Sequence, residues 1–146
     1  HPIIQSVKKS FALCIRNRKG TLTTNLEASP SILIADELHI TNMVYNLIDN
    51  AIKYSPDKVE ITLTTRNEGN NLILSVQDSG MGISKEAQAH IFEKFYRVST
   101  GDVHDVKGFG IGLNYVSQIV KLHHGTISVD SEIGRGSTFT VSLPIL

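Results

Sequence analysis

The stretch Asp36–Tyr54 most constrains the fold of this chain, because its apolar residues recur at spacings of three and four. This spacing places them on one side of an α-helix, and Ser55-Pro56 ends the helix. The apolar stripe consists of Ile40, Met43, Val44, Leu47, Ile48, Ala51 and Ile52.

Shorter elements surround this helix. Apolar spacing over residues 3–16, before Gly20, predicts a first helix, and Ile111–His123 predicts a later one. Ser84 is expected to cap a short helix that runs to about Phe92. Strands are predicted at Thr21–Ala28, Val59–Thr65, Leu72–Gln77, Thr126–Val129 and Thr138–Leu143.

Most of these strands are too close together in sequence for a helical crossover, so the sheet is expected to be mixed or mainly antiparallel. With about three helices beside it, the fold class is α+β, a two-layer α/β sandwich. The 146 residues fit one domain, 1–146, and 40% hydrophobic residues supply its core.

Fourteen basic residues balance fourteen acidic ones, so composition gives no broad electrostatic case for nucleic-acid binding. The single Cys14 lies in an apolar stretch, residues 11–15, and is expected to be buried and inert. There is no run of about 18 apolar residues to span a membrane. A cytoplasmic location is expected, in a parent protein whose membrane attachment the chain does not report.

The face of the Asp36–Tyr54 helix opposite the apolar stripe carries amides and a lysine. Its residues Asn42, Asn46, Asn50 and Lys53 lie four, four and three positions apart. A solvated surface is one interpretation, although asparagine is a mediocre helix former. The other is a site for Mg²⁺ and phosphates, since amide oxygens bind Mg²⁺ and lysine supplies charge.

A carboxylate and two glycines follow the predicted strand Leu72–Gln77. Asp78 enters the run Ser79-Gly80-Met81-Gly82, which is either an ordinary turn or a base-recognition site. A fixed carboxylate can accept a hydrogen bond from adenine's amino group, worth about 1.5–3 kcal/mol. Glycine at positions 80 and 82 lets the backbone come close to the base.

Three alternating glycines, Gly108, Gly110 and Gly112, open the helix predicted at Ile111–His123. Free N–H groups at a helix start suit phosphate, and the glycines also suit a hinge for a lid formed by residues 98–107. The spacing matches neither the Rossmann fingerprint nor a P-loop.

Together these blocks resemble the catalytic, ATP-binding domain of sensor histidine kinases, in the superfamily that includes gyrase, Hsp90 and MutL. The match runs from about residue 11 to the C-terminus. In chain order, the blocks are the N box, the first glycine box, the F box, the second glycine box and the third glycine box. In this chain they are Asn46–Ser55, Asp78–Gly82, Phe92–Arg97, Gly108–Gly112 and Gly134–Ser137.

The resemblance implies a Bergerat-type ATP-binding sandwich with ATP and Mg²⁺ as cofactors. It implies that Asn50 coordinates Mg²⁺, that Asp78 binds the adenine amino group, and that Ser137 approaches adenine through water. The implied catalytic positions are Asn46, Lys53 and Arg97. The implied cofactor-binding positions are Asn50, Tyr54, Asp78, Gly80, Gly82, Tyr96, Gly108, Gly110, Gly112, Leu113 and Ser137.

One position separates branches of this superfamily. Members that hydrolyse ATP carry a glutamate four residues before the metal-binding asparagine, where it serves as general base for water. Here that position is Asn46, and an amide cannot take a proton at neutral pH. Transfer to histidine, whose imidazole brings its own lone pair, is therefore favoured over hydrolysis.

The acceptor block of these kinases, a histidine followed by glutamate and a downstream Pro-Leu, is absent from the chain. The implied partners are a dimerisation and phosphoacceptor domain of the same protein and a response-regulator receiver domain. The chain itself is expected to be monomeric and its parent a homodimer. Two alternatives stay open, an anti-sigma-factor-type serine kinase and a nucleotide-sensing module without turnover.

Overall fold

The computed structural model describes residues 1–29, 35–56, 58–93 and 112–145. Within these residues one sheet has the strand order β1-β2-β3-β5-β4. The strands are β1 (Thr21–Leu26), β2 (Glu60–Glu68), β3 (Asn71–Asp78), β4 (Thr126–Glu132) and β5 (Gly136–Pro144). The helices are α1 (Pro2–Asn17), α2 (Glu37–Lys53), α3 (Lys85–Gln88) and α4 (Gly112–Leu122).

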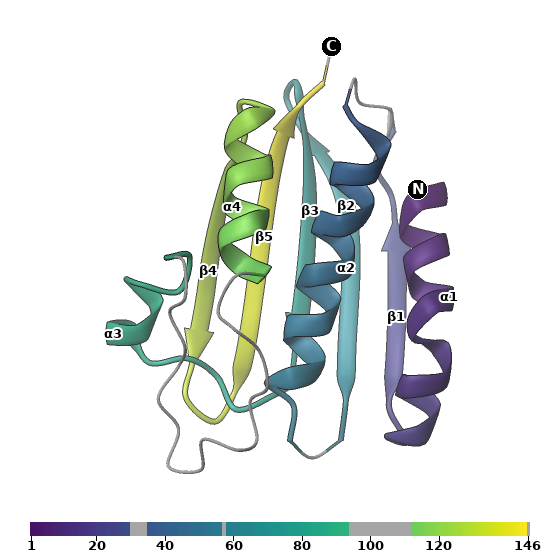
Figure 1. Ribbon diagram of the computed structural model, residues 1–146, viewed down its shortest axis with the longest axis vertical. Helices are drawn as coiled ribbons and strands as arrows, with labels where there is room; N and C mark the ends of the chain where they lie inside the picture. The colour runs from purple at the N-terminus through teal and green to yellow at the C-terminus, as the bar shows by residue number, and fades with distance from the viewer. Residues whose placement is uncertain (30–34, 57, 94–111, 146) are drawn as a thin grey trace.

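The sheet is mixed, as predicted. Strands β1 and β2 are parallel, whereas β2–β3, β3–β5 and β4–β5 are antiparallel. The parallel pair requires a crossover, and α2 provides it. Helices α1, α2 and α4 lie side by side over one face of the sheet (Figure 1). The predicted two-layer α/β sandwich is confirmed.

Helix α2 forms where its periodicity predicts. Asp36 is the N-cap, and its side chain accepts a hydrogen bond from the His39 N–H at 3.1 Å. The stripe faces the sheet, and Ile48 at its centre has no exposed surface. Buried members of the stripe are Met43, Val44, Leu47, Ile48, Ala51 and Ile52.

Cys14 and the short helix after Ser84 differ from the sequence predictions. Cys14 is exposed, not buried, because the inner face of α1 passes through Phe11 and Ile15 and Cys14 lies about 100° round the helix from Ile15. The short helix after Ser84 ends at Gln88 instead of near Phe92. Beyond it, i to i+3 bonds such as His90 N–H to the Ala87 carbonyl, at 3.0 Å, form tighter turns.

Every described strand after β1 is longer than predicted. Strand β4 continues past Val129 to Glu132, and β5 begins at Gly136, before the expected start. The extra ladder pairs Ser131 with Ser137 and Asp78 with Ser137. These residues therefore lie in regular sheet.

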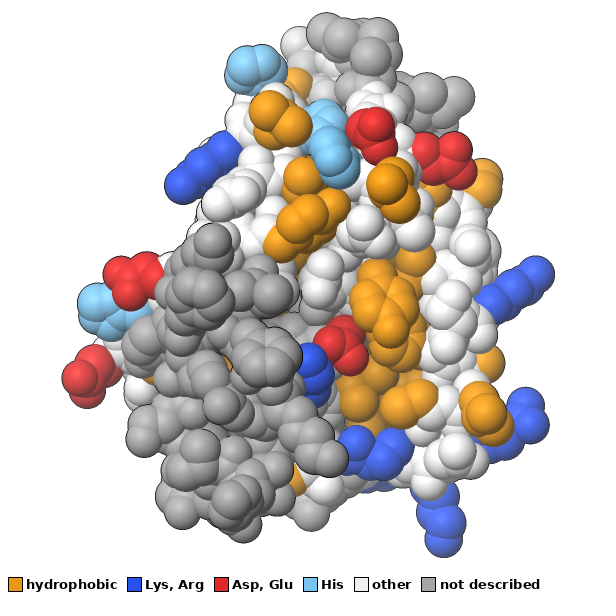
Figure 2. All heavy atoms as spheres, viewed as in Figure 1, with side chains coloured by type: hydrophobic (Ala, Val, Ile, Leu, Met, Phe, Trp, Pro, Cys, Tyr) orange, Lys and Arg blue, Asp and Glu red, His pale blue; other side chains and the backbone are white. Residues whose placement is uncertain are grey.

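Figure 2 shows the helix-covered side of the molecule, where hydrophobic side chains lie between charged ones of both signs. This mixture agrees with the balanced composition. No described helix combines the length and the apolar character that a bilayer crossing needs.

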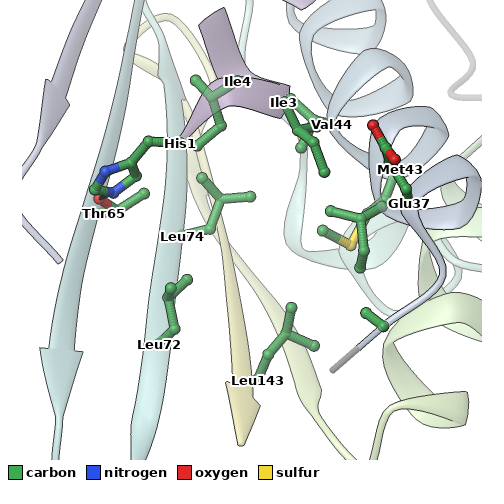
Figure 3. Close-up of a pocket in the computed structure, with 12 residues that line it drawn as sticks. His1, Ile3, Ile4, Glu37, Met43, Val44, Thr65, Leu72, Leu74 and Leu143 are labelled. Atoms are coloured by element: carbon green, nitrogen blue, oxygen red, sulfur yellow. Dashed lines mark hydrogen bonds between the residues drawn. The ribbon is translucent and has the colours of Figure 1, made fainter. Parts of the chain in front are cut away.

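An apolar cavity of about 280 Å³ lies between α1, α2 and the sheet, at the end where β3 begins (Figure 3). Leu72 and Leu74 of β3 line it, with Met43 of α2 opposite. Asp78 ends the same strand, so the cavity and the predicted nucleotide site lie at opposite ends of β3.

Ile48→Ala in α2 should lower the free energy of unfolding by about 2–5 kcal/mol, because the side chain is fully buried and its loss leaves a cavity. The control is Leu38→Ala in the same helix, where the side chain is 65% exposed and the change should stay within about 0.5 kcal/mol. Urea denaturation measures both. Equal losses would contradict the packing of α2 on the sheet.

Candidate functional site

Three segments meet at the end of the sheet where β3 finishes. The carbonyl of Tyr54, just after α2, accepts a hydrogen bond from the Met81 N–H at 2.9 Å. The Met81 carbonyl accepts in turn from the Gly134 N–H at 2.8 Å. The loop after Asp78 is thereby fixed between the end of α2 and the β4–β5 turn, and it joins the predicted N box to the first and third glycine boxes.

Asp78 is a buried carboxylate in this junction. The residue is only 3% exposed, and burial raises the pKa of its carboxyl to about 6. Two backbone N–H groups oppose this rise, one from Gly80 to Oδ1 at 2.9 Å and one from Ser137. At neutral pH the group is therefore ionised, and a carboxylate has more acceptor positions than these two donors use.

The glycines around Asp78 are required by close packing. A Cβ on Gly80 would lie 2.1 Å from the Tyr54 carbonyl oxygen. Gly82 has a φ of +77°, and its Cβ would lie 2.0 Å from the Glu132 carbonyl oxygen. These glycines let the loop approach α2 and β4. Their predicted approach to a base stays a prediction.

A third glycine in this junction lies within the predicted third glycine box, although it was given no role of its own. Gly136 has a φ of +104°, and a Cβ there would lie 2.1 Å from the carbonyl oxygen of Asp78 itself. It therefore allows β5 to begin directly beside the end of β3.

The amide face of α2 divides into two parts. The Asn46 Nδ2 donates to the Asn42 carbonyl one turn earlier at 2.7 Å, and its Oδ1 lies 3.1 Å from the position a Cβ on Gly112 would take. Asn46 therefore packs against the start of α4. The Asn50 Nδ2 is buried and makes no hydrogen bond within the described part of the chain.

An unpaired buried amide is the kind of group that a bound ligand satisfies. If the Asn50 side-chain amide is flipped, its oxygen takes the place of the nitrogen. Asn50 can therefore bind a cation as well as a phosphate or water. Among the described residues, no three His, Cys, Asp or Glu side chains gather as a metal cluster. Mg²⁺ fits such a site because it commonly takes one or two protein ligands and completes its shell with water and phosphate oxygens.

Lys53, predicted beside the phosphates, forms an ion pair with Asp49 at 2.9 Å. Both side chains remain about one-third exposed, at 37% and 32%, so the ammonium stays accessible. The partner was absent from the sequence predictions, although its position one turn before Lys53 is a recognisable signal.

The structure brings together part of the predicted site only. Tyr96, Arg97, Gly108 and Gly110 lie outside the described residues, as does the predicted lid, 98–107. Leu113 is buried in α4 and belongs to the hydrophobic core, so a contact with the cofactor stays a prediction. Phe92, the first residue of the predicted F box, packs edge-on against Phe139 with ring centroids 6.2 Å apart.

Sequence reasoning missed two polar residues that support the loop after Asp78. The Ser131 hydroxyl accepts from the Ile83 N–H at 2.7 Å. The Gln88 side chain donates to the Ile83 carbonyl at 2.7 Å and to the Ser131 carbonyl at 3.0 Å. The period of two in β4 contains a signal for Ser131, since it follows Ile127 and Val129 on the inward side.

Residues 35–146 match the family model described as histidine kinase-, DNA gyrase B- and HSP90-like ATPase. The chain is 47% identical to sensor protein RprX of Bacteroides fragilis over 146 residues, which are 99% of this chain and 28% of that protein.

Two solved structures resemble the whole described fold. The catalytic domain of histidine kinase ThkA, in a nucleotide-free form, superposes with a TM-score of 0.84 at 25% identity, over 98% of this chain and 92% of that one. Full-length ShkA in complex with AMPPNP gives a TM-score of 0.83 at 25% identity, over 98% of this chain and 29% of that one.

Asp78→Asn should stabilise the domain in the absence of nucleotide, because it removes a buried charge and keeps an acceptor oxygen. The carboxyl has an ordinary pKa of 3.8 when unfolded and about 6 when folded. Between these values the folded state holds the extra proton, so the wild type loses stability as pH rises through this window. The advantage of the variant should grow from about pH 4 to pH 6 and then level off, at up to about 3 kcal/mol.

Urea denaturation at a series of pH values measures this difference. The control is Asp130→Asn, which removes an exposed charge from β4. A difference between Asp78→Asn and wild type that stays constant from pH 4 to pH 8 would contradict a buried, ionised Asp78.

Proposed function

The chain belongs to the family of histidine kinase-, DNA gyrase B- and HSP90-like ATPases and has the catalytic, ATP-binding domain of sensor histidine kinases, and we propose that it positions Mg-ATP for transfer of the γ-phosphoryl group to a histidine. It spans 28% of the length of its relative RprX. The acceptor, the partners and the activity of the whole protein are therefore proposals.

The buried carboxylate of Asp78 carries this proposal. It is held by the backbone N–H groups of Gly80 and Ser137, and its ionised state at neutral pH suits a ligand that donates hydrogen bonds. Adenine's exocyclic amino group is such a donor, and a charged acceptor makes that bond strong. Asp78 is accordingly assigned the adenine amino group.

Asn50 is assigned to the metal. Its unpaired buried amide lies in the last turns of α2, before the Tyr54 carbonyl that fixes the loop after Asp78. When bound, Mg²⁺ would neutralise the charge that develops on the transferred phosphoryl group. Asn50 would contribute one protein ligand, and the nucleotide and water would contribute the rest.

Lys53 is assigned to the phosphates as a mobile charge. Its ion pair with Asp49 is partly exposed, and such a pair is worth little net free energy in water. The ammonium can therefore exchange Asp49 for a phosphate oxygen at small cost. Asp49 would hold the lysine near the site when no nucleotide is bound.

Asn46 argues for transfer over hydrolysis. Its amide donates to the Asn42 carbonyl and packs against α4, so this position offers no base to activate water. A neutral imidazole needs no such base, because a ring nitrogen carries the attacking lone pair. The proposed acceptor is a histidine on a separate dimerisation domain of the parent homodimer, and a receiver domain would take the phosphoryl group next.

Asn50→Ala should abolish Mg²⁺-dependent phosphoryl transfer and leave measurable adenine binding, because the metal ligand and the base pocket are separate. The assay supplies the acceptor helices of the parent protein as a second chain, with γ-labelled ATP. The matched control is Asn42→Ala, which removes an amide from the same face of α2 two turns earlier and should retain transfer. Unchanged transfer by Asn50→Ala would remove Asn50 from the metal role.

The same assay separates the competing functions. Histidine phosphate is labile in acid, so the label should be lost on acid treatment. Acid-stable label would identify a serine kinase. Absence of transfer from a wild-type chain that binds ATP would favour a nucleotide-sensing module.

A further inference from the structure

A row of polar side chains crosses three neighbouring strands on the face that the helices cover. The ladder pairs Ser131 of β4 with Ser137 of β5, and Ser137 with Asp78 of β3. Residues directly opposite in a ladder project to the same face. On the other side of Asp78, its ladder partner is Ile61 of β2, which is buried in the core. The Asp78 carboxylate therefore lies between the two serine hydroxyls and the hydrophobic core.

The hydroxyl of Ser131 has three partners at short distance. It accepts from the Ile83 N–H at 2.7 Å, donates to the Gly136 carbonyl at 2.9 Å, and lies 2.7 Å from the Ser137 Oγ. Ser131 and Ser137 are both buried, at 9% and 3% exposed.

Counting protons fixes the direction of the contact between the two serines. A hydroxyl has one proton, and the Gly136 carbonyl, which can only accept, takes that of Ser131. If the proton turned to Ser137 instead, two acceptor oxygens would face each other at 2.9 Å without a proton between them. Ser137 therefore donates to Ser131, and the remaining capacity of the Ser137 oxygen is to accept.

We propose that Ser131 is a positioning residue that sets base specificity. Its oxygen accepts the hydrogen bond that the Ser137 hydroxyl donates, which leaves Asp78 and Ser137 as neighbouring acceptors for the base. Two acceptors favour a base with an amino group at that edge and disfavour one with a carbonyl. The inference rests on the proposed binding of ATP and adds the residue that makes the pocket select against 6-oxopurines.

Gln88 holds Ser131 in place from the other side. Its amide nitrogen donates both to the Ser131 carbonyl and to the Ile83 carbonyl. The backbone N–H of Ile83 in turn donates to the Ser131 hydroxyl. Ser131 is thus fixed through its side chain and its backbone.

Ser131→Ala tests the proposal through the ratio of the dissociation constants for inosine triphosphate and ATP. Inosine carries a carbonyl where adenosine carries the amino group. Without Ser131, the Ser137 hydroxyl is free to donate to that carbonyl, so the ratio should fall about fivefold, the value of one ordinary hydrogen bond. Fluorescence competition titration with Mg²⁺ present measures both constants on the same protein.

The ratio is insensitive to a loss of stability, because both nucleotides report on the same folded molecules. The matched control is Ser75→Ala, which removes another hydroxyl from the β3–β5 pair, where Ser75 lies 3.5 Å from the Thr140 hydroxyl. Its ratio should equal that of the wild type.

A double-mutant cycle shows whether Ser131 acts through Ser137. In the Ser137→Ala background, Ser131→Ala should leave the ratio unchanged, because no hydroxyl remains to be turned. An unchanged ratio in the single Ser131→Ala variant, with wild-type ATP binding intact, would overturn the inference and leave the proposed function standing. A wild-type chain that binds neither nucleotide would overturn both.

Discussion

The hydrogen bond from Met81 to the Tyr54 carbonyl fixes the geometry on which the proposed site depends. It joins the end of α2 to the loop after β3 at a backbone distance that only glycine permits at position 80. The loop's other side is held by Gly134 and by the Ser131 hydroxyl. Because both sides of the loop are fixed, the end of β3 that carries Asp78 is held beside the end of α2 that carries Asn50.

This arrangement sets stability against function. An ionised carboxylate in a buried position is unfavourable unless it is hydrogen-bonded, and here two backbone N–H groups offset only part of the burial. Asn50 similarly buries an amide nitrogen without a partner in the described residues. Unsatisfied groups of this kind are expected where a ligand completes the site, and they make the nucleotide part of the domain's stabilisation.

Local sequence patterns predict much of the fold and part of the site. Helix α2 was predictable because its apolar period and the Ser55-Pro56 stop are local, and Asp78 stood out because it precedes two glycines. Cys14 was mispredicted because residues adjacent in sequence do not share a helix face. Ser131 and Gln88 were missed since their roles depend on strand register and on a loop folded back from distant sequence. Neither relation is encoded at short range.

The most direct test of this account is a calorimetric titration of the chain with Mg-ATP, for the wild type and for Asp78→Ala. We expect saturable binding by the wild type and its loss in the variant, with both proteins equally folded by circular dichroism. Equal affinity in the two proteins would contradict the assignment of Asp78 to the adenine amino group and with it the site described at the end of β3.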